Sequence, residues 1–290
     1  MTIDWAKYVL LVYLVWMYVD RNSCIGNKRR WTWMRDLPWW RRHKDYFPIR
    51  LLKTCDLPPD RNYIFALCPH GVFSFGAMTS FVTDALDFRE KFPGLKLFLC
   101  TLNVVFQMPI LREFALGQGF SSVSEESLNE ILDAREKGQA AGVVIGGAAE
   151  AALSSPNRYK ILLSRRKGFC KVALKNGADI VPVYSFGESD LYYLKQPEEG
   201  SLLHEFQILF KKLTTIFPVV FYGVGPLPIF PRRIPVTVTV GKPITVKKVD
   251  NPTKEDIDEL HGKFRDSIVC LFNEYKGKYL MNKDAELVIC

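Results

Sequence analysis

The sequence predicts an α/β protein with a mostly parallel central sheet flanked by helices, preceded by an N-terminal membrane-anchoring segment. After about residue 46, short apolar runs alternate with helix-like stretches, and the loops between them are short. Before that point the chain holds an uncharged apolar run and all six tryptophans. We therefore divide the chain into a basic, Trp-rich interfacial segment, residues 1–45, and a folded domain, residues 46–290.

The apolar run at residues 8–19 reads YVLLVYLVWMYV. It is shorter than the roughly 20 residues that span a bilayer as a helix, so whether it crosses the membrane or only enters it stays open. A cleaved signal peptide is the rival interpretation, but the flank at residues 20–23 lacks a small-x-small cleavage site. Basic residues follow the run, which places the rest of the chain on the cytosolic side.

The predicted strands are short apolar runs bounded by polar or turn residues, at residues 62–68, 95–101, 142–147, 178–186, 219–222 and 236–240. Predicted helices occupy residues 74–86, 168–176 and a stretch from a capping box at residues 122–125 towards residue 137. A second capping box, at residues 253–256, opens a final helix to about residue 276. Residues 200–235 are less regular and rich in Phe and Pro, which favours a long surface loop, with a lipid-contacting insertion as the alternative.

Composition excludes several classes of protein. Apolar residues make up 48% of the chain, enough for a sizeable core, and the net charge of +8 favours anionic partners. No nucleic-acid-binding motif accompanies that charge. The seven cysteines are widely spaced without a C-x-x-C pair, and the four histidines show no metal-ligand spacing. The sequence therefore predicts no disulfide framework and no metal site.

His70 is the first candidate for chemistry. It lies in the turn Cys68-Pro69-His70-Gly71, directly after a predicted buried strand, where ligands bind in open α/β sheets. Pro69 stiffens the turn and Gly71 lets a ligand approach the backbone. An imidazole with a pKa near neutrality can act as general base towards a hydroxyl. The alternative is a turn histidine bonded to a backbone carbonyl.

Glu150 is the second candidate. It follows a strongly apolar strand and the glycine pair Gly146-Gly147, so its carboxylate needs a partner if it is buried. We expect it to orient the His70 ring and to stabilise the imidazolium. The alternative is a Glu that caps the next helix.

A basic segment is the third candidate. Arg165, Arg166 and Lys167 precede Gly168, which opens a predicted helix. Backbone N–H groups and the dipole at a helix start suit phosphate, so this segment is a candidate site for the phosphates of a nucleotide-containing substrate. A solvated basic edge is the alternative.

In order along the chain, these motifs resemble the type-2 diacylglycerol acyltransferase family, which includes monoacylglycerol and wax-alcohol acyltransferases. The stretches that carry the resemblance extend from about residue 40 to residue 277 and include Tyr46-Phe-Pro48, Asn62-Tyr-Ile-Phe65, Pro69-His-Gly71, Gly146-Gly-Ala-Ala-Glu150, Arg166-Lys-Gly-Phe169, Tyr184-Ser-Phe-Gly-Glu188 and Val240-Gly-Lys-Pro-Ile244.

The resemblance implies a glycerolipid-acyltransferase-like domain over residues 46–290 that makes triacylglycerol from acyl-CoA and diacylglycerol. It assigns the catalytic base to His70 and the supporting acid to Glu150. It implies the endoplasmic reticulum membrane, with a cytosolic catalytic domain, and the lipid droplet surface. Acyl-CoA is a co-substrate here, with its phosphates on the basic segment, and no cofactor is expected. The resemblance leaves the oligomeric state open, including a homo-oligomer.

Two departures from the family pattern bear on function. Cys68 stands where the family motif has its first histidine, and Tyr222-Gly-Val-Gly225 replaces a later His-Gly-Arg-Gly. We expect Cys68 to be tolerated, because the second histidine does the chemistry.

The alternative acceptors are a monoacylglycerol or a long-chain alcohol. A third interpretation, motivated by Cys68, is a non-catalytic protein that binds lipid at a membrane or droplet surface.

Overall fold

The computed structural model describes residues 4–26, 29–133, 135–195, 200–202, 205, 207–209, 220–224 and 230–290, and it has the predicted α/β class. Half of residues 200–235, the predicted surface loop, lie outside the described residues.

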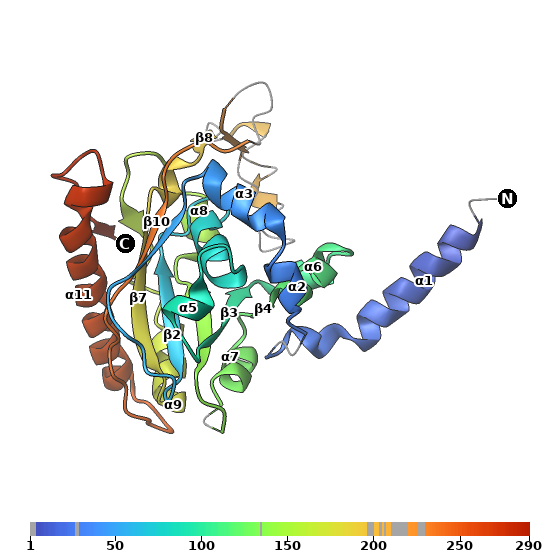
Figure 1. The fold of residues 1–290 in the computed structure, drawn as a ribbon, viewed down its shortest axis with the longest axis horizontal. Helices are drawn as coiled ribbons and strands as arrows, with labels where there is room; N and C mark the ends of the chain where they lie inside the picture. The colour runs from blue at the N-terminus through green and yellow to red at the C-terminus, as the bar shows by residue number, and fades with distance from the viewer. Residues whose placement is uncertain are drawn as a thin grey trace.

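A seven-stranded sheet forms the centre of the domain (Figure 1). In spatial order its strands are β1 (Arg50–Lys53), β10 (Thr237–Val240), β7 (Asp179–Phe186), β2 (Tyr63–Cys68), β5 (Gln139–Val144), β3 (Lys96–Thr101) and β4 (Phe120–Ser122). The five strands from β7 to β4 are parallel, whereas β10 pairs with β7 in the antiparallel sense. β2 therefore lies between β7 and β5, and the carboxyl ends of all three meet at one edge.

Two apolar layers cover the faces of this sheet, because successive side chains of each strand point to opposite faces. Ile64, Ala66 and Cys68 of β2 pack into one layer with α7 (Glu125–Ile131), α9 (Gly168–Asn176) and α11 (Lys254–Tyr279). Tyr63, Phe65 and Leu67 pack into the other. That layer contains α4 (Phe75–Ala77), the π-helical turn η2 (Met78–Val82) and α5 (Phe88–Lys91).

Most predicted elements are confirmed, and the exceptions have local causes. The capping box at residues 253–256 opens α11 through reciprocal hydrogen bonds of Thr253 and Asp256. The prediction of a cap at residues 122–125 is wrong by two residues. Ser122 belongs to β4, Ser124 caps α7, and α7 ends at Ile131. The predicted helix over residues 74–86 is broken after Ala77 by the π turn and ends at Val82.

The predicted strand over residues 219–222 exists as β9 (Val220–Tyr222), but it is not part of the main sheet. It pairs with β8 (Tyr193–Lys195) in a small antiparallel sheet. β11 (Val288–Ile289) likewise pairs with β6 (Lys160–Ile161). In addition, the backbone oxygen of Cys290 accepts the N–H groups of Leu163 (2.8 Å) and Ser164 (2.7 Å), which fixes the chain that leads to α9.

The amino-terminal helix α1 (Asp4–Val19) projects away from the domain (Figure 1). It joins the domain through the 3-10 turn η1 (Arg21–Cys24), α2 (Thr32–Arg35) and α3 (Pro38–Tyr46). At its base, buried Arg112 of α6 (Leu111–Gln118) pairs with Asp20. Among the residues that the structure describes, no helix combines the length and the apolar character that crossing a bilayer requires.

Candidate active site

His70 lies at the centre of the edge where β7, β2 and β5 end. The buried strand β2 ends at Cys68, and a cis peptide bond joins Cys68 to Pro69. The chain then turns through Gly71, whose φ of 59° favours glycine. The Ser74 hydroxyl donates to the His70 backbone oxygen at 2.7 Å, which closes the turn. We call residues 70–76 the His70 loop.

The ring of His70 is half-buried and one of its nitrogens has a defined partner. Nδ1 lies 3.0 Å from the backbone oxygen of Gly71. A carbonyl only accepts, so Nδ1 carries a proton, and in the neutral ring Nε2 carries the lone pair. Burial lowers the pKa of His70 below its ordinary value. Such an imidazole is neutral at physiological pH and suited to accept a proton at Nε2.

Glu150 meets the His70 loop at its backbone. Glu150 belongs to the short helix α8 (Gly147–Ala151), which follows β5, and its residue is 3% exposed. Its Oε1 accepts the backbone N–H of His70 at 2.5 Å, and its Oε2 accepts that of Leu162 at 2.6 Å. The carboxylate therefore fixes the loop through the main chain, whereas we expected it at the ring. The carbonyl of Gly71 occupies the orienting role expected of Glu150.

The environment of Glu150 opposes its charge. Burial raises the pKa of Glu150, while the N–H groups of Leu162 and His70 and the charge of Arg166 act in the other direction. Two N–H donors are the natural complement of a buried carboxylate. This arrangement brings residues 70, 150 and 162 together from three segments of the chain.

The glycine pair after β5 accommodates this carboxylate. A Cβ at Gly146 would collide with Oε2 of Glu150, so a larger residue would displace the carboxylate. A Cβ at Gly147 would meet nothing within 4 Å, which leaves open space beside the backbone at the start of α8. We expected a ligand to approach the backbone at Gly71, but a Cβ there would meet Glu188, and the open space lies at Gly147 instead.

The predicted basic segment lies at the same edge. Nη2 of Arg166 donates to the backbone oxygen of Gly146 at 3.3 Å, next to Glu150. Nζ of Lys167 lies 2.5 Å from Oδ1 of Asp258 on α11. Arg165 and Arg166 are exposed and Gly168 opens α9, with open space beside it. The three cations thus lie at a helix start beside the glycine pair, although Lys167 already has a carboxylate partner.

An aromatic cluster adjoins the His70 loop and was not predicted from the sequence. The ring of Phe73 lies 5.0 Å from that of Phe221 and 5.6 Å from those of Phe75 and Tyr192. His43 of α3 packs against Phe75 at 5.5 Å, and burial lowers its pKa to about 4. Phe73 is 47% exposed, so the cluster reaches the surface beside the loop. Its members come from distant segments without a shared motif, which is why sequence patterns did not reveal it.

Besides the aromatic cluster, the prediction also missed Glu188. Glu188 follows β7 after Gly187, and Glu150 follows β5 within α8, so an acidic residue shortly after a predicted strand was the available signal. Glu188 is 2% exposed and its Oε2 lies 2.9 Å from the backbone nitrogen of Gly76. Burial raises the pKa of Glu188 to about 7.

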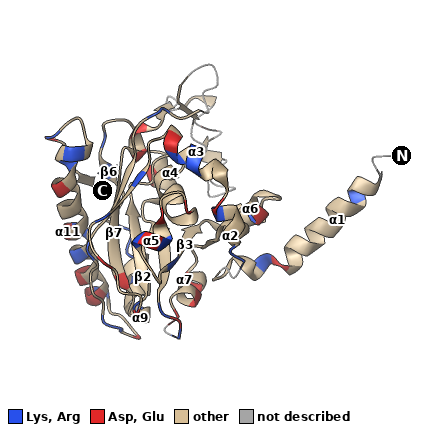
Figure 2. Ribbon diagram, viewed as in Figure 1, with Lys and Arg blue, Asp and Glu red and all other residues tan. Residues whose placement is uncertain are grey.

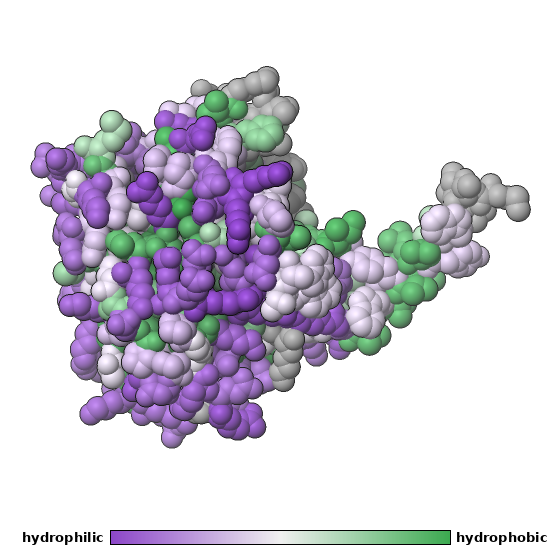
Figure 3. Space-filling view, in the orientation of Figure 1, coloured by the Kyte–Doolittle hydropathy of each residue, from purple (hydrophilic) through white to green (hydrophobic). Residues whose placement is uncertain are grey.

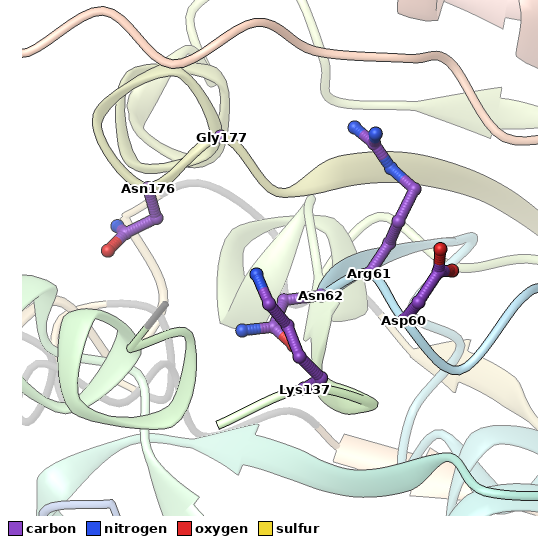
Figure 4. Close-up of a pocket in the computed structure, with 6 residues that line it drawn as sticks. All are labelled: Asp60, Arg61, Asn62, Lys137, Asn176 and Gly177. Atoms are coloured by element: carbon purple, nitrogen blue, oxygen red, sulfur yellow. The ribbon is translucent and has the colours of Figure 1, made fainter. Parts of the chain in front are cut away.

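A pocket of about 110 Å³ lies at the opposite end of the sheet (Figure 4). It is lined by Asp60, Arg61, Asn62, Lys137, Asn176 and Gly177, which precede β2, precede β5 or end α9. Arg61 pairs there with buried Asp179, and the Asn62 amide caps three backbone carbonyls. These contacts stabilise the amino ends of the strands, far along β2 from His70. In the part of the chain that the structure describes, no group of three or more His, Cys, Asp or Glu residues could hold a metal ion.

Comparison with known proteins identifies the family. The profile of the family described as diacylglycerol acyltransferase matches residues 1–290. The chain belongs to the diacylglycerol acyltransferase family. It is 41% identical to diacylglycerol O-acyltransferase 2 of Danio rerio over 286 residues, which cover 97% of this chain and 79% of the relative. It is 40% identical to the human protein of the same name over 276 residues, or 93% of this chain and 71% of the relative.

A relative with a different name is about equally similar. The chain is 40% identical to human 2-acylglycerol O-acyltransferase 3 over 269 residues, which cover 91% of this chain and 79% of the relative. The predicted family resemblance is thereby confirmed, and membership in this family makes the chain an acyltransferase.

Proposed function

We propose that this chain transfers a fatty acyl group from acyl-CoA to the hydroxyl of diacylglycerol and so makes triacylglycerol. The observation that carries the proposal is identity of about 40% over more than nine-tenths of the chain with proteins named diacylglycerol O-acyltransferase. The neutral imidazole of His70 at the end of β2 supports the same reaction, because deprotonation of an alcohol is its main chemical requirement.

In the proposed reaction, Nε2 of His70 takes the proton of the acceptor hydroxyl as the oxygen attacks the thioester carbonyl. The C–O bond forms, the C–S bond breaks, and the thiolate of CoA leaves with the proton that the imidazolium returns. Backbone N–H groups near Gly71 or at Gly146–Gly147 would stabilise the developing oxyanion. Glu150 would act by holding the backbone of His70 in place.

Acyl-CoA serves as co-substrate in this proposal, and the reaction needs no cofactor. Arg165, Arg166 and Lys167, at the start of α9, would bind the CoA phosphates together with the N–H groups of the first turn. The aromatic cluster around Phe73 and Tyr192 would contact the acyl chain or the acceptor, because it is apolar and borders the His70 loop.

An acceptor panel tests the proposal. Microsomes that contain the wild type or His70→Ala would receive one labelled acyl-CoA with diacylglycerol, monoacylglycerol or a long-chain alcohol. We expect labelled triacylglycerol from the wild type and a loss of at least about 100-fold in the variant. A His70→Ala protein with normal transfer would refute the role of His70, and a wild type inactive on every acceptor would leave the lipid-binding alternative.

Monoacylglycerol is the second candidate acceptor. The similarity to 2-acylglycerol O-acyltransferase 3, at 40% identity, equals that to the human diacylglycerol enzyme. Preferential labelling of diacylglycerol product from monoacylglycerol in the same panel would favour this candidate, and labelled wax ester would favour the long-chain alcohol.

We further propose that α1 and a neighbouring apolar surface seat the protein on the cytosolic face of the endoplasmic reticulum membrane and on lipid droplets. Figure 3 shows apolar side chains along α1 and around α6. By contrast, Figure 2 shows acidic and basic residues over the domain and few along α1. Ten large apolar side chains of α1 besides Trp5 are exposed, and bilayer contact would cover them.

The exposed surface continues from α1 to the loop before α6. The backbone N–H of Ile110 donates to the Tyr13 hydroxyl at 2.9 Å, which joins the two elements. Ile110 is 80% exposed although it is apolar, and its φ is 66°, a conformation that a β-branched residue rarely adopts. Trp33 and Trp39, both more than 60% exposed, have the ring type that membrane interfaces favour.

Vesicle flotation tests this placement. The full chain should float with vesicles of phosphatidylcholine that contain anionic lipid. Replacement of Trp33, Trp39 and Ile110 by Ser should weaken flotation, whereas the matched control Met281→Ser, at a fully exposed site on the domain, should not. Equal flotation of both variants would contradict the contribution of this surface.

A further inference from the structure

A second buried carboxylate contacts the His70 loop. Glu188 begins the 3-10 turn η4 (Glu188–Asp190), directly after β7 and Gly187. Its Oε2 accepts the backbone N–H of Gly76 at 2.9 Å and the hydroxyl of Ser185 at 3.0 Å. Gly76 is the last residue of the His70 loop, so Glu188 binds the carboxyl-terminal end of this loop.

The near end of the loop packs on the same side chain. A Cβ at Gly71 would lie 2.7 Å from Cγ of Glu188 and 3.3 Å from its Oε1. A Cβ at Gly76 would lie 2.5 Å from Oε2. Both glycines therefore allow the backbone to approach Glu188 more closely than any other residue type could. Glu188 therefore contacts the His70 loop on both sides of Phe73, whose ring is exposed.

The carboxyl group of Glu188 lies in an environment that disfavours its charge. Glu188 is 2% exposed, and Oε1 is buried without a hydrogen-bond partner among the described residues. No basic side chain of the described residues forms an ion pair with it, unlike Asp179 with Arg61. Burial of a carboxyl group without a cation is unfavourable, so an apolar residue would stabilise the fold more. What the carboxyl group supplies instead is an acceptor for the loop.

We propose that Glu188 is a positioning residue that fixes the His70 loop from the β7 side, as Glu150 fixes it from the β5 side. β2 lies between these two strands, so the loop that extends from its end is held on both flanks. Glu150 holds the backbone of His70 and Glu188 holds that of Gly76. The imidazole then keeps its place relative to Gly147 and the basic segment while substrates bind. This inference rests on the proposed function of His70.

Three substitutions test the proposal by steady-state kinetics. Glu188→Leu removes the acceptor, and we expect kcat to fall about 100-fold, as a misplaced catalytic group does, with KM for acyl-CoA little changed. Glu188→Gln keeps an acceptor oxygen and should restore kcat to within about threefold of the wild type. Ser185→Ala is the matched control, because it removes the other partner of Oε2 and leaves the loop contact; its kcat should stay near the wild-type value.

Equal loss of kcat in Glu188→Leu and Ser185→Ala would overturn the proposal, since the effect would then lie in the packing of β7. Full activity of Glu188→Leu would overturn it too. If Glu188→Leu does not fold, Glu188→Asp replaces it. This shorter carboxylate cannot reach Gly76 in the same backbone position, so unchanged kcat would likewise contradict the role.

Amide hydrogen exchange separates this inference from the proposed function. In a folded Glu188→Leu or Glu188→Asp protein, exchange at residues 71–76 should become faster while exchange in β5 and α9 stays as in the wild type. This result does not depend on turnover, so it would support the loop contact even in a chain without transferase activity. Unchanged exchange at residues 71–76 would refute the contact.

Discussion

The Oε1 atom of Glu150 accepts the backbone N–H of His70 at 2.5 Å, while the ring nitrogen Nδ1 of His70 lies 3.0 Å from the Gly71 carbonyl. Glu150 and His70, the proposed acid and base, are therefore linked through the main chain. This arrangement separates two tasks that a Ser-His-Asp triad combines in one carboxylate. The carbonyl sets the tautomer of the ring, and Glu150 sets the position of the residue.

Glu150→Gln should reduce both stability and activity. An amide cannot accept from both His70 and Leu162, so one buried N–H loses its partner, at a cost of about 1–3 kcal/mol. Thermal unfolding and kcat measure the two effects. The pH at which activity is half-maximal should stay unchanged, because Glu150 does not contact the ring. A shift of that midpoint would instead indicate a direct action of Glu150 on the imidazole.

The acid limb of kcat/KM should have its midpoint below pH 6.5. Burial lowers the pKa of His70, so the ring stays neutral and able to accept a proton at pH values below the ordinary histidine pKa of about 6.5. Measurements between pH 5 and pH 8 check this expectation. They should include Glu188→Gln, which removes the other site group expected to titrate near neutrality. A midpoint above pH 6.5 in that variant would contradict the prediction.

The stability difference between Glu188→Gln and the wild type should depend on pH. Burial raises the pKa of Glu188 from 4.5 to about 7, so between these values the folded protein holds a proton that the unfolded chain has released. This group therefore makes wild-type stability fall as pH rises from about 4.5 to 7, and its effect is constant above. The melting temperature of the variant minus that of the wild type should increase over this window. A flat difference would show that Glu188 titrates normally.

Cys68→Ala should retain transferase activity. The thiol is buried in the layer that contains α7, α9 and α11, and burial raises its pKa well above the ordinary value, so it is neither a base nor a nucleophile. We expect a loss of about 1 kcal/mol in stability and little change in kcat. Loss of activity in a folded Cys68→Ala protein would show that this position contributes to the chemistry.

The sequence was sufficient for the class of the fold and for the edge that carries the site. Alternating apolar strands locate His70, Glu150 and the basic segment at strand or helix ends, and parallel strands bring such ends together. It was insufficient for the partners of each group. Which atom of His70 meets Glu150 depends on the turn at Gly71, and the contact of Leu162 depends on a strand contributed by residues 288–289. Glu188 was overlooked because its role is visible only once β7 lies beside β2.

The pairing of β6 with β11 has a consequence for distant positions. Leu162, whose N–H binds Glu150, lies between Ile161 and Leu163, and the backbone of Cys290 bonds to both of these neighbours. Residues 288–290 thus hold in place the residues on either side of Leu162, and Leu162 in turn contacts Glu150. Removal of residues 288–290 should loosen Glu150 and slow turnover, although none of the three reaches His70. Substitutions at residues 288–290 that inactivate the protein could then act by slowing turnover as well as by destabilising the fold.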